Sequence, residues 1–273
     1  MTPLNDIRVG GKRLEALWHG PSPEEAATLV FLHEGLGCAE MWHDFPARLA
    51  DASGCGALVY SRAGYGGSDP CGLPRPVRFM HDEALEILPR VLERVGVRDF
   101  FLVGHSDGAS ISLIYSGTRS GAGSGARSGN RAGGARLKGL IALAPHALCE
   151  EATLRAIEEI SETFKKGPLR RKLAKYHGAG VDGAFWGWSD VWLHPDFKNW
   201  NIEKYLPGIS APVLVVQGQN DPYGTRVHAD SIVARVRGSV ETLMLEDCGH
   251  SPHQEKSAET LDAMTRFIRR AGG

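Results

Sequence analysis

The sequence predicts an α/β fold with a mostly parallel, doubly wound sheet and an inserted helical cap. Three observations predict it. Short apolar segments alternate along the chain with segments of helical periodicity, the pattern of a parallel sheet covered by helices on both faces. Directly after one apolar segment, a serine stands between two glycines in a strand–turn–helix context. A long aromatic-rich segment, residues 148–207, interrupts the alternation.

The elements follow in order from the N-terminus. Residues 6–19 predict a hairpin that turns at Gly10-Gly11, because a glycine pair between short strands favours a tight turn. The apolar spacing predicts strands over residues 28–32, 57–60, 100–103, 137–144, 212–216 and 240–245. Helical spacing predicts helices over residues 80–95, 109–115, 152–164 and 257–271. We therefore expect a core of residues 1–147 and 208–273, with residues 148–207 as the helical cap.

Residues 117–136 depart from this pattern. They consist almost entirely of Gly, Ser, Ala, Arg and Asn, a composition that cannot bury a core. We expect a flexible, solvated insertion on the side away from the site. The alternative is an anion-binding arm that uses its arginines, Arg119, Arg127, Arg131 and Arg136.

Composition narrows the class of protein. The chain has 273 residues, 42% of them hydrophobic, 23% charged, and a net charge of −1. This gives no electrostatic reason to bind nucleic acid or an anionic membrane. No apolar run approaches a membrane span, and the first 20 residues lack a signal core. We expect a monomer or homodimer that acts on a small-molecule substrate without nucleic-acid or membrane partners.

The five cysteines are scattered, odd in number and without metal-ligand spacing. They predict reduced thiols, and with them a cytoplasmic location. We expect no metal and no organic cofactor.

Gly104-His105-Ser106-Asp107-Gly108 is the most informative motif. It follows an apolar strand and precedes a helical segment. Glycines two residues either side of a serine permit the sharp turn that exposes a nucleophilic hydroxyl. The motif therefore predicts Ser106 as a nucleophile.

A serine nucleophile needs a base and an orienting acid. Asp221 follows the strand of residues 212–216, and His250 follows the strand of residues 240–245. The chain order of serine, acid and histidine, each after a strand, predicts a catalytic triad. Asp247 and Asp190 compete as the acid, but Asp247 is too close to His250 in the chain and Asp190 lies in the cap segment.

These residues, with Leu32-His33-Glu34-Gly35-Leu36-Gly37 and Ser61-Arg62-Ala63-Gly64-Tyr65-Gly66, resemble the serine hydrolases of the α/β-hydrolase fold along nearly the whole chain. The Gly104–Gly108 motif, the segment 227–230 and the Gly249-His250 loop are similar to those of one branch of this fold, the biphenyl-hydrolase-like enzymes. That branch includes the amino-acid-ester hydrolase that cleaves valacyclovir and the meta-cleavage C–C hydrolases.

The resemblance implies that the backbone N–H groups of Gly35 and Asp107 form the oxyanion hole, with Leu36 as the alternative to Gly35. Glu34 stands where many relatives have glycine. We expect it to form a buried ion pair with Arg62, since unpaired buried carboxylates are costly; the alternative is that it faces the pocket. Asp107 either recognises a substrate ammonium group, as in the valacyclovir-cleaving relative, or bonds only locally.

The substrate pocket is expected between the cap aromatics and the oxyanion loop. We predict that Glu34, Leu36 and Asp107, together with Trp186, Trp188 and Trp192, contribute to substrate binding. Some of these aromatics are expected only to pack the cap onto the sheet. His33 and His105 are expected to be structural, and His253 and Glu255 to brace the catalytic loop.

The predicted activity is hydrolysis of a small, largely apolar or aromatic carboxylic ester, with an aminoacyl ester as one form. A serine nucleophile excludes the aspartate-dependent dehalogenases and epoxide hydrolases of the fold. A triad is shared by esterases, thioesterases, lactonases and meta-cleavage C–C hydrolases, so these stay open. A ligand-binding receptor on a hydrolase scaffold is the alternative of a different class.

Overall fold

The computed structural model describes residues 1–4, 7–119 and 134–272. Within these residues the central sheet has eight strands in the order β1-β4-β6-β5-β7-β8-β9-β10. They are β1 (Thr2–Pro3), β4 (Ala16–His19), β5 (Thr28–Leu32), β6 (Gly56–Tyr60), β7 (Asp99–His105), β8 (Arg136–Leu143), β9 (Val213–Gly218) and β10 (Val240–Leu245). All pairs from β6 to β10 are parallel, whereas β4 pairs antiparallel with β6 and with β1. The predicted mostly parallel sheet is confirmed.

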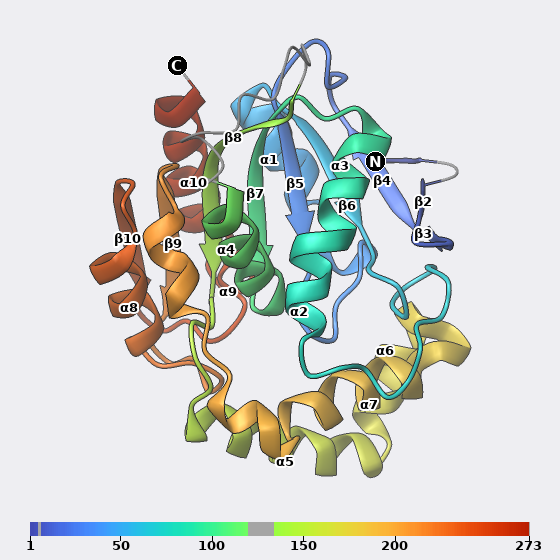
Figure 1. Cartoon of the computed structure of the whole chain (residues 1–273). Helices are drawn as coiled ribbons and strands as arrows, with labels where there is room; N and C mark the ends of the chain where they lie inside the picture. Colours follow the sequence, from blue (N-terminus) through green and yellow to red (C-terminus); the bar gives the residue numbers. More distant parts are fainter. Residues whose placement is uncertain (5–6, 120–133, 273) are drawn as a thin grey trace.

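Helices cover both faces of the sheet (Figure 1). They are α1 (Phe45–Ser53), α2 (Phe79–Asp82), α3 (Leu88–Val95), α4 (Asp107–Arg119), α5 (Glu151–Lys165), α6 (Pro168–His177), α7 (Val181–Trp192), α8 (Val227–Arg235), α9 (Pro252–Glu255) and α10 (Ser257–Gly272). Alternate residues of β5 show the two layers. Leu29 and Phe31 belong to the apolar core that α1 and α10 complete, while Val30 and Leu32 belong to the core on the side of α3, α4 and α8.

Short helical turns join several of these elements. The 3₁₀ turns are η1 (Glu40–Trp42), η4 (Gly178–Gly180), η5 (Pro195–Asn199) and η6 (Glu203–Gly208). The helix predicted over residues 80–95 is α2, a π-helical turn η2 (Glu83–Ile87) and α3. Pro89 explains the π turn, because it has no N–H to donate to the carbonyl of Leu85 and its ring crowds that carbonyl.

Several elements begin or end a few residues from the predicted positions, and two of these differences change how a segment is assigned. The N-terminal hairpin is confirmed as β2 (Ile7–Val9) paired with β3 (Lys12–Leu14), but the residues after it form β4 and join the large sheet. The predicted insertion, residues 117–136, is too long at both ends. Gly117 belongs to α4, where it lies against the backbone of Tyr205, and Arg136 begins β8 with two hydrogen bonds to Asp99. Residues 120–133 lie outside the described residues.

The segment between β8 and β9 contains α5, α6 and α7, which lie across the carboxyl ends of the parallel strands (Figure 1). We call residues 148–207 the cap. Its aromatic residues Phe197, Trp192 and Trp200 pack in contact with one another, with ring centroids 4.6 to 5.8 Å apart. The cap therefore covers the end of the sheet at which α/β proteins place their ligands.

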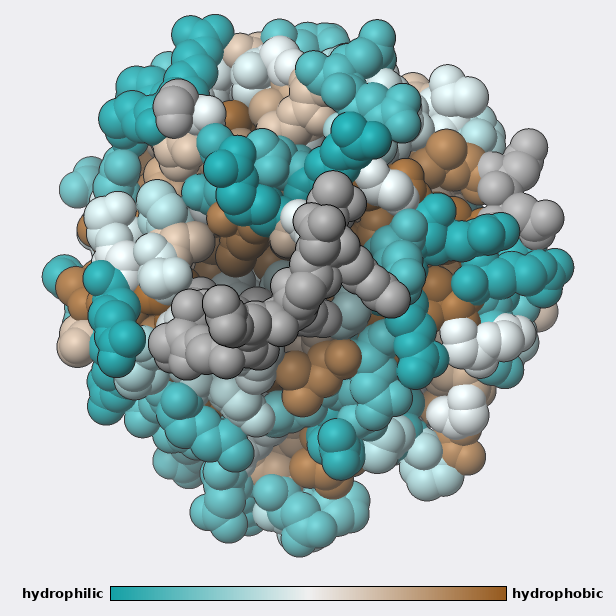
Figure 2. Space-filling view, turned by 45° about the horizontal axis from the view of Figure 1, so that its top comes forward, coloured by the Kyte–Doolittle hydropathy of each residue, from teal (hydrophilic) through white to brown (hydrophobic). Residues whose placement is uncertain are grey.

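The opposite end of the molecule has a different character. Hydrophilic side chains predominate on the face shown in Figure 2, and apolar ones lie scattered between them. This is the ordinary composition of a solvated surface.

Candidate active site

Ser106 lies between β7 and α4 in a strained backbone conformation, with a positive φ of 53°. A non-glycine residue adopts this region only where the surroundings hold it there. Here the Ser106 N–H donates to the Leu143 carbonyl at 2.9 Å, and the Ser106 carbonyl accepts from the N–H groups of Ala109 and Ser110. The turn therefore starts α4 and is tied to the neighbouring strand β8 at the same time.

The two flanking glycines allow this turn by close approach. A Cβ on Gly104 would meet the Gly108 carbonyl oxygen at 2.4 Å, and a Cβ on Gly108 would meet the Leu32 carbonyl oxygen at 2.0 Å. Neither position tolerates a side chain without a shift of backbone. The spacing read from the sequence thus has a steric cause.

His250 and Asp221 are brought together as predicted. The Nδ1 atom of His250 lies 2.9 Å and 2.8 Å from the two carboxylate oxygens of Asp221. Asp221 also accepts hydrogen bonds from the Gln217 side chain at 2.7 Å and from the Tyr223 N–H at 2.8 Å. With Nδ1–H donating to the carboxylate, Nε2 of His250 carries the lone pair that a general base needs.

The charge on Asp221 is stabilised by these partners. Burial by itself would raise the pKa of this carboxyl, but the hydrogen bond and charge of His250 and the Tyr223 N–H hold it below its usual range. Behind His250 lies the ring of His146, 5.9 Å away, whose pKa burial and the neighbouring histidines lower to about 3. His146 is therefore neutral near pH 7 and leaves Asp221 as the charged partner of His250.

The loop that carries His250 is fixed by several hydrogen bonds. The His250 carbonyl accepts from His105 Nε2 at 2.7 Å, which ties the loop to the end of β7 beside Ser106. The Glu255 carboxylate accepts from the N–H groups of Gly249 and Ser251 at 2.7 Å and 2.9 Å, as expected for a residue that braces the loop. Among the described residues, Ser106 Oγ forms no hydrogen bond with His250.

The competing residues lie elsewhere. Asp247 is exposed next to the loop, and Asp190 is exposed on the cap. His253 is buried against the indole of Trp42, with ring centroids 4.7 Å apart. Neither Asp247 nor Asp190 takes the place of Asp221 as the hydrogen-bond partner of His250 Nδ1.

The candidate oxyanion loop, residues 33–37, is fixed by hydrogen bonds of His33 and Arg62. His33 Nδ1 donates to the Glu34 carbonyl, and its Nε2 accepts from the Arg62 N–H. The Arg62 guanidinium donates to the carbonyls of His33 and Glu34. Within the described chain, the N–H groups of Gly35 and Asp107 donate to no protein acceptor, so both are free to meet a developing oxyanion.

The expected ion pair between Glu34 and Arg62 is wrong. The Glu34 carboxylate lies 3.5 Å from Nδ1 of His105 instead, while Arg62 bonds the backbone. Burial opposes a charge on either partner of this pair. The carboxylate nevertheless raises the pKa of His105, and His105 holds the pKa of Glu34 below its usual range. The partly buried carboxylate of Glu34 is therefore paired, but with His105, the residue before Ser106.

Asp107 is 1% exposed and begins α4. Its Oδ1 accepts a hydrogen bond from the Trp192 indole at 3.2 Å, and its Oδ2 has no partner among the described residues. Burial raises the pKa of Asp107 to about 6, although the charges of Arg62 and Arg75 and the Trp192 hydrogen bond act in the other direction. Its side chain thus connects the nucleophile turn to the cap.

The three tryptophans expected near substrate lie in different places. Trp188 packs against Gly35, where a Cβ would meet its Nε1 at 2.0 Å, and Trp192 bonds Asp107. Trp186 is half-buried on the outer side of the cap, with Lys165 5.9 Å from the centre of its ring. Leu36 is half-buried in the oxyanion loop. The structure therefore brings Trp188 and Trp192 to Gly35 and Asp107, whereas Trp186 lines a separate cleft beside α7.

Sequence reasoning missed two residues of the site. Gln217 supports Asp221, and the only signal for it was a polar residue at the end of a buried strand. His177, at the end of α6, accepts from the Gly66 N–H at 3.0 Å and donates to the Leu36 carbonyl at 2.9 Å. It joins the cap to the oxyanion loop across 141 residues of sequence, and no local pattern indicates it.

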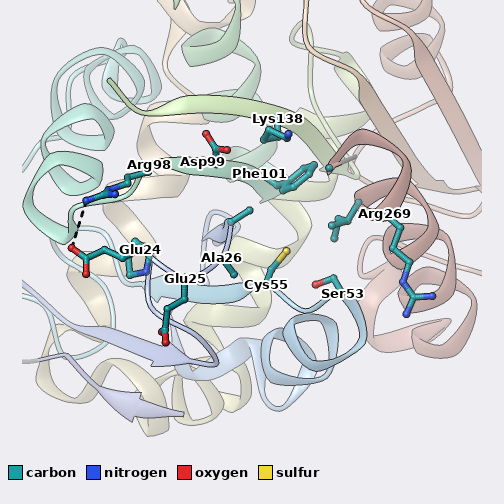
Figure 3. A pocket seen from close by; sticks show the side chains of 14 residues that line it. Glu24, Glu25, Ala26, Ser53, Cys55, Arg98, Asp99, Phe101, Lys138 and Arg269 are labelled. Carbon is teal, nitrogen blue, oxygen red and sulfur yellow. Dashed lines mark ion pairs between the residues drawn. The ribbon is translucent and has the colours of Figure 1, made fainter. Parts of the chain in front are cut away.

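A cavity of 520 Å³ lies at the end of the sheet opposite the cap. Figure 3 shows its charged lining, which includes Lys138, Arg269 and an ion pair of 3.6 Å between Arg98 and Glu24. It adjoins the amino ends of the parallel strands, where Asp99 begins β7. Open α/β sheets bind ligands at the carboxyl ends, so this cavity is not the candidate active site.

Two further searches cover residues 1–4, 7–119 and 134–272. No helix in these ranges combines the length and apolar character needed to cross a membrane. No group of three or more histidine, cysteine, aspartate or glutamate side chains in them is arranged to hold a metal ion.

The model of the "Alpha/beta hydrolase family" matches residues 29–263. A search of curated protein sequences gave no match.

Several solved structures are similar in fold. An esterase from Exiguobacterium antarcticum has 15% identity and a TM-score of 0.72, over 98% of this chain and 99% of that one. A proline iminopeptidase from Mycobacterium smegmatis has 19% identity and a TM-score of 0.68, over 97% of both chains. An enol-lactonase from Burkholderia xenovorans has 16% identity and a TM-score of 0.68, over 95% and 98%. At these identities the likeness concerns the fold alone.

Proposed function

Since the chain belongs to the α/β hydrolase family, we propose that it hydrolyses small carboxylic esters through an acyl-enzyme on Ser106. The observation that carries the proposal is the contact of His250 Nδ1 with both oxygens of Asp221, at 2.9 Å and 2.8 Å. This contact orients the imidazole and fixes the tautomer in which Nε2 accepts a proton.

In the proposed reaction, Ser106 Oγ attacks the ester carbonyl carbon while His250 Nε2 takes its proton. The oxyanion accepts hydrogen bonds from the N–H groups of Gly35 and Asp107. His250 then protonates the departing alkoxide, and the acyl group stays on Ser106. Water attacks the acyl-enzyme with the same base, which releases the acid and restores the serine. Asp221 stays ionised and stabilises the imidazolium in both halves.

We propose that residues 148–207 act as a cap that selects the substrate. The parts of it nearest to the catalytic groups are the indoles of Trp188 and Trp192, at Gly35 and Asp107. Ser106 itself is 6% exposed beneath them. An apolar or aromatic acyl group suits such a covering, since aromatic side chains offer large apolar contact areas. We also propose that, within the family, the chain is related to the biphenyl-hydrolase-like enzymes.

The test is steady-state turnover of 4-nitrophenyl butyrate, with mass spectrometry of the quenched protein to find butyryl-Ser106. We expect many turnovers and an acyl group on Ser106 alone. A receptor on a hydrolase scaffold would give at most one slow turnover. A matched panel of a thioester, a lactone and a meta-cleavage dienoate then ranks the competing bond types by kcat/KM, and a value higher than the ester value would replace the ester by that bond.

A further inference from the structure

A further cavity lies beside α7 of the cap. This cleft has a volume of 350 Å³ and lies between the segment 73–77 and helix α7 of the cap. The two run close together in Figure 1. Most of the cleft lining is apolar and comes from Leu73, Pro74, Val77, Trp186 and Val191. The volume falls in the range of small-molecule sites.

The cleft contains one buried cation, Arg75. This side chain is 8% exposed and lies over the ring of Tyr65, with its guanidinium carbon 4.5 Å from the ring centre. Its Nη2 donates to the Ala63 carbonyl at 3.0 Å. Among the described residues, its Nε has no acceptor and no carboxylate forms an ion pair with it.

Burial opposes the charge of this guanidinium, but Tyr65 and Cys71, with the more distant carboxyls of Glu83 and Asp107, hold the pKa of Arg75 above its usual value. The comparison with Arg62 is informative. Among the described residues, Arg62 is also buried and its Nε also has no acceptor, but two backbone carbonyls accept from its other nitrogens. Arg75 has one such carbonyl, and it is the one of the two that lines the cleft.

On the opposite wall of the cleft, the backbone of α7 packs against Arg75 with no side chain between them. Gly187 of α7 stands there, and a Cβ at this position would lie 2.9 Å from Nε of Arg75. Asp190 and His194 are exposed at the rim. A rim carboxylate acts through water and is screened, whereas a buried guanidinium acts at short range in a weakly polar environment. The cleft therefore favours an anion at its base.

The cleft is also linked to the catalytic groups. The Tyr65 ring on which Arg75 lies is 5.0 Å from the ring of His33 in the oxyanion loop. The charge of Arg75 lowers the pKa of Asp107, the residue after the nucleophile. The same helix that walls the cleft places Trp188 on Gly35.

We propose that this cleft binds a carboxylate on the part of the substrate remote from the scissile bond, with Arg75 as the group that recognises it. The substrates would be esters whose apolar chain carries a second, ionised carboxyl group. This inference rests on the proposed ester hydrolysis for its kinetic part only; binding of a carboxylate in the cleft is independent of it.

Binding is tested first, with octanoate and the neutral octanamide as probes, by calorimetry on the Ser106→Ala protein. We expect octanoate to bind more tightly than octanamide. Adding Arg75→Met should weaken octanoate about tenfold to a hundredfold, the usual effect of a hydrogen bond to a charged group, and leave octanamide nearly unchanged. Arg78→Met is the matched control, since it removes an exposed guanidinium paired with Asp82 and should alter neither affinity. Equal octanoate affinity with and without Arg75 would overturn the proposal.

The kinetic test compares two 4-nitrophenyl esters, the half ester of octanedioic acid and the ester of octanoic acid, in a protein with Ser106 intact. The ratio of their kcat/KM values should fall about tenfold to a hundredfold in Arg75→Met. If Arg75→Met does not fold, Arg75→Lys and Gly187→Ala should each lower the ratio in the same direction. An unchanged ratio would refute the substrate assignment, whereas no turnover of either ester by the wild type would refute the proposed function and leave the calorimetric result to decide the site.

Discussion

The core and the cap meet at the candidate active site through different kinds of contact. The core fixes its catalytic groups by the backbone: the Ser106 N–H bonds β8, and the Asp221 carboxylate accepts from the Tyr223 N–H. The cap reaches the same region through side chains of α5, α6 and α7. Thr153 of α5 donates to the Tyr223 carbonyl, in the loop that carries Asp221. His177 bonds the oxyanion loop, and Trp192 bonds Asp107.

We infer from this difference that the core determines the chemistry and the cap determines substrate preference. Groups on strand ends are positioned by the sheet itself, and a catalytic geometry needs such rigid support. Contacts made by the tips of cap side chains can change without altering the sheet. Changes in the core should therefore affect every substrate alike, whereas changes in the cap should affect stability, loop placement or preference.

The largest expected effect tests the core. Ser106→Ala should lower kcat by about 10⁴-fold or more, because only the nucleophilic oxygen is lost. The melting temperature should stay close to that of the wild type. Ser112→Ala is the matched control: Ser112 is a buried serine of α4 whose hydroxyl bonds the Gly108 carbonyl at 2.8 Å. Retention of more than a few per cent of the wild-type rate in Ser106→Ala would remove this serine from the mechanism.

The next effect concerns packing of the cap. Trp192 is 1% exposed and Trp186 is half-buried. Trp192→Ala should lower the free energy of unfolding by about 3–5 kcal/mol, the usual cost of emptying a buried aromatic site. Trp186→Ala should cost about 1 kcal/mol, since it removes less buried area. Urea denaturation measures both, and equal costs would contradict the placement of the two indoles.

A smaller effect tests the link between the two regions. His177→Phe keeps a ring but leaves the Gly66 N–H and the Leu36 carbonyl without their partner. We expect kcat to fall about tenfold, less than the loss caused by removing an oxyanion donor, while KM changes less. Lys175→Ala, an exposed change on the same helix, is the control.

His177 also predicts a pH dependence. Burial holds its pKa below the ordinary value, so the folded state favours the neutral ring that accepts from Gly66. Its contribution to stability is present above about pH 6.5 and declines as the pH falls toward the lowered pKa of the folded state. The wild type should therefore lose stability on acidification relative to His177→Phe. Parallel pH curves for the two proteins would show that the ring is not held in this way.

Most of the core could be predicted from the sequence because its signals are local. The strands of residues 28–32 and 240–245 have the predicted bounds. The first is an apolar run that is buried along its whole length, whereas most residues of the second are exposed or half-buried. Ser106, Asp221 and His250 could be proposed as a triad from the sequence because each follows a strand. The π turn η2 was not predicted, although Pro89 could have indicated an irregular helix.

The contacts that cross between segments could not be predicted. Glu34 and Arg62 have opposite charges and seemed natural partners, yet Arg62 is needed by the carbonyls of the oxyanion loop. His177 carries no local signal, because its two partners lie 111 and 141 residues away. Trp186 and Trp188 are two positions apart on one helix and face different sides. Only the packed structure separates them.

The smallest effect concerns substrate charge. The structure favours the local role of Asp107 over recognition of an ammonium group, because Oδ1 accepts from Trp192 and the charges of Arg62 and Arg75 act on the same carboxyl. An ammonium group would meet both guanidinium charges as well. We therefore expect the 4-nitrophenyl esters of valine and of 3-methylbutanoic acid to have kcat/KM values within about threefold, or about 0.6 kcal/mol.

The pH at which the two esters are compared sharpens this prediction. The pKa of Asp107 is raised by burial to about 6, so its carboxyl is mainly protonated at pH 5 and mainly ionised at pH 7. If Asp107 recognised the amine, the preference for the valine ester would rise between these values, with a midpoint near the pKa, and Asp107→Asn would abolish the rise. We expect a ratio that changes little over this range in both proteins. A tenfold increase in the wild type alone would restore amine recognition to Asp107 and assign the cap hydrogen bond from Trp192 the role of orienting that carboxylate.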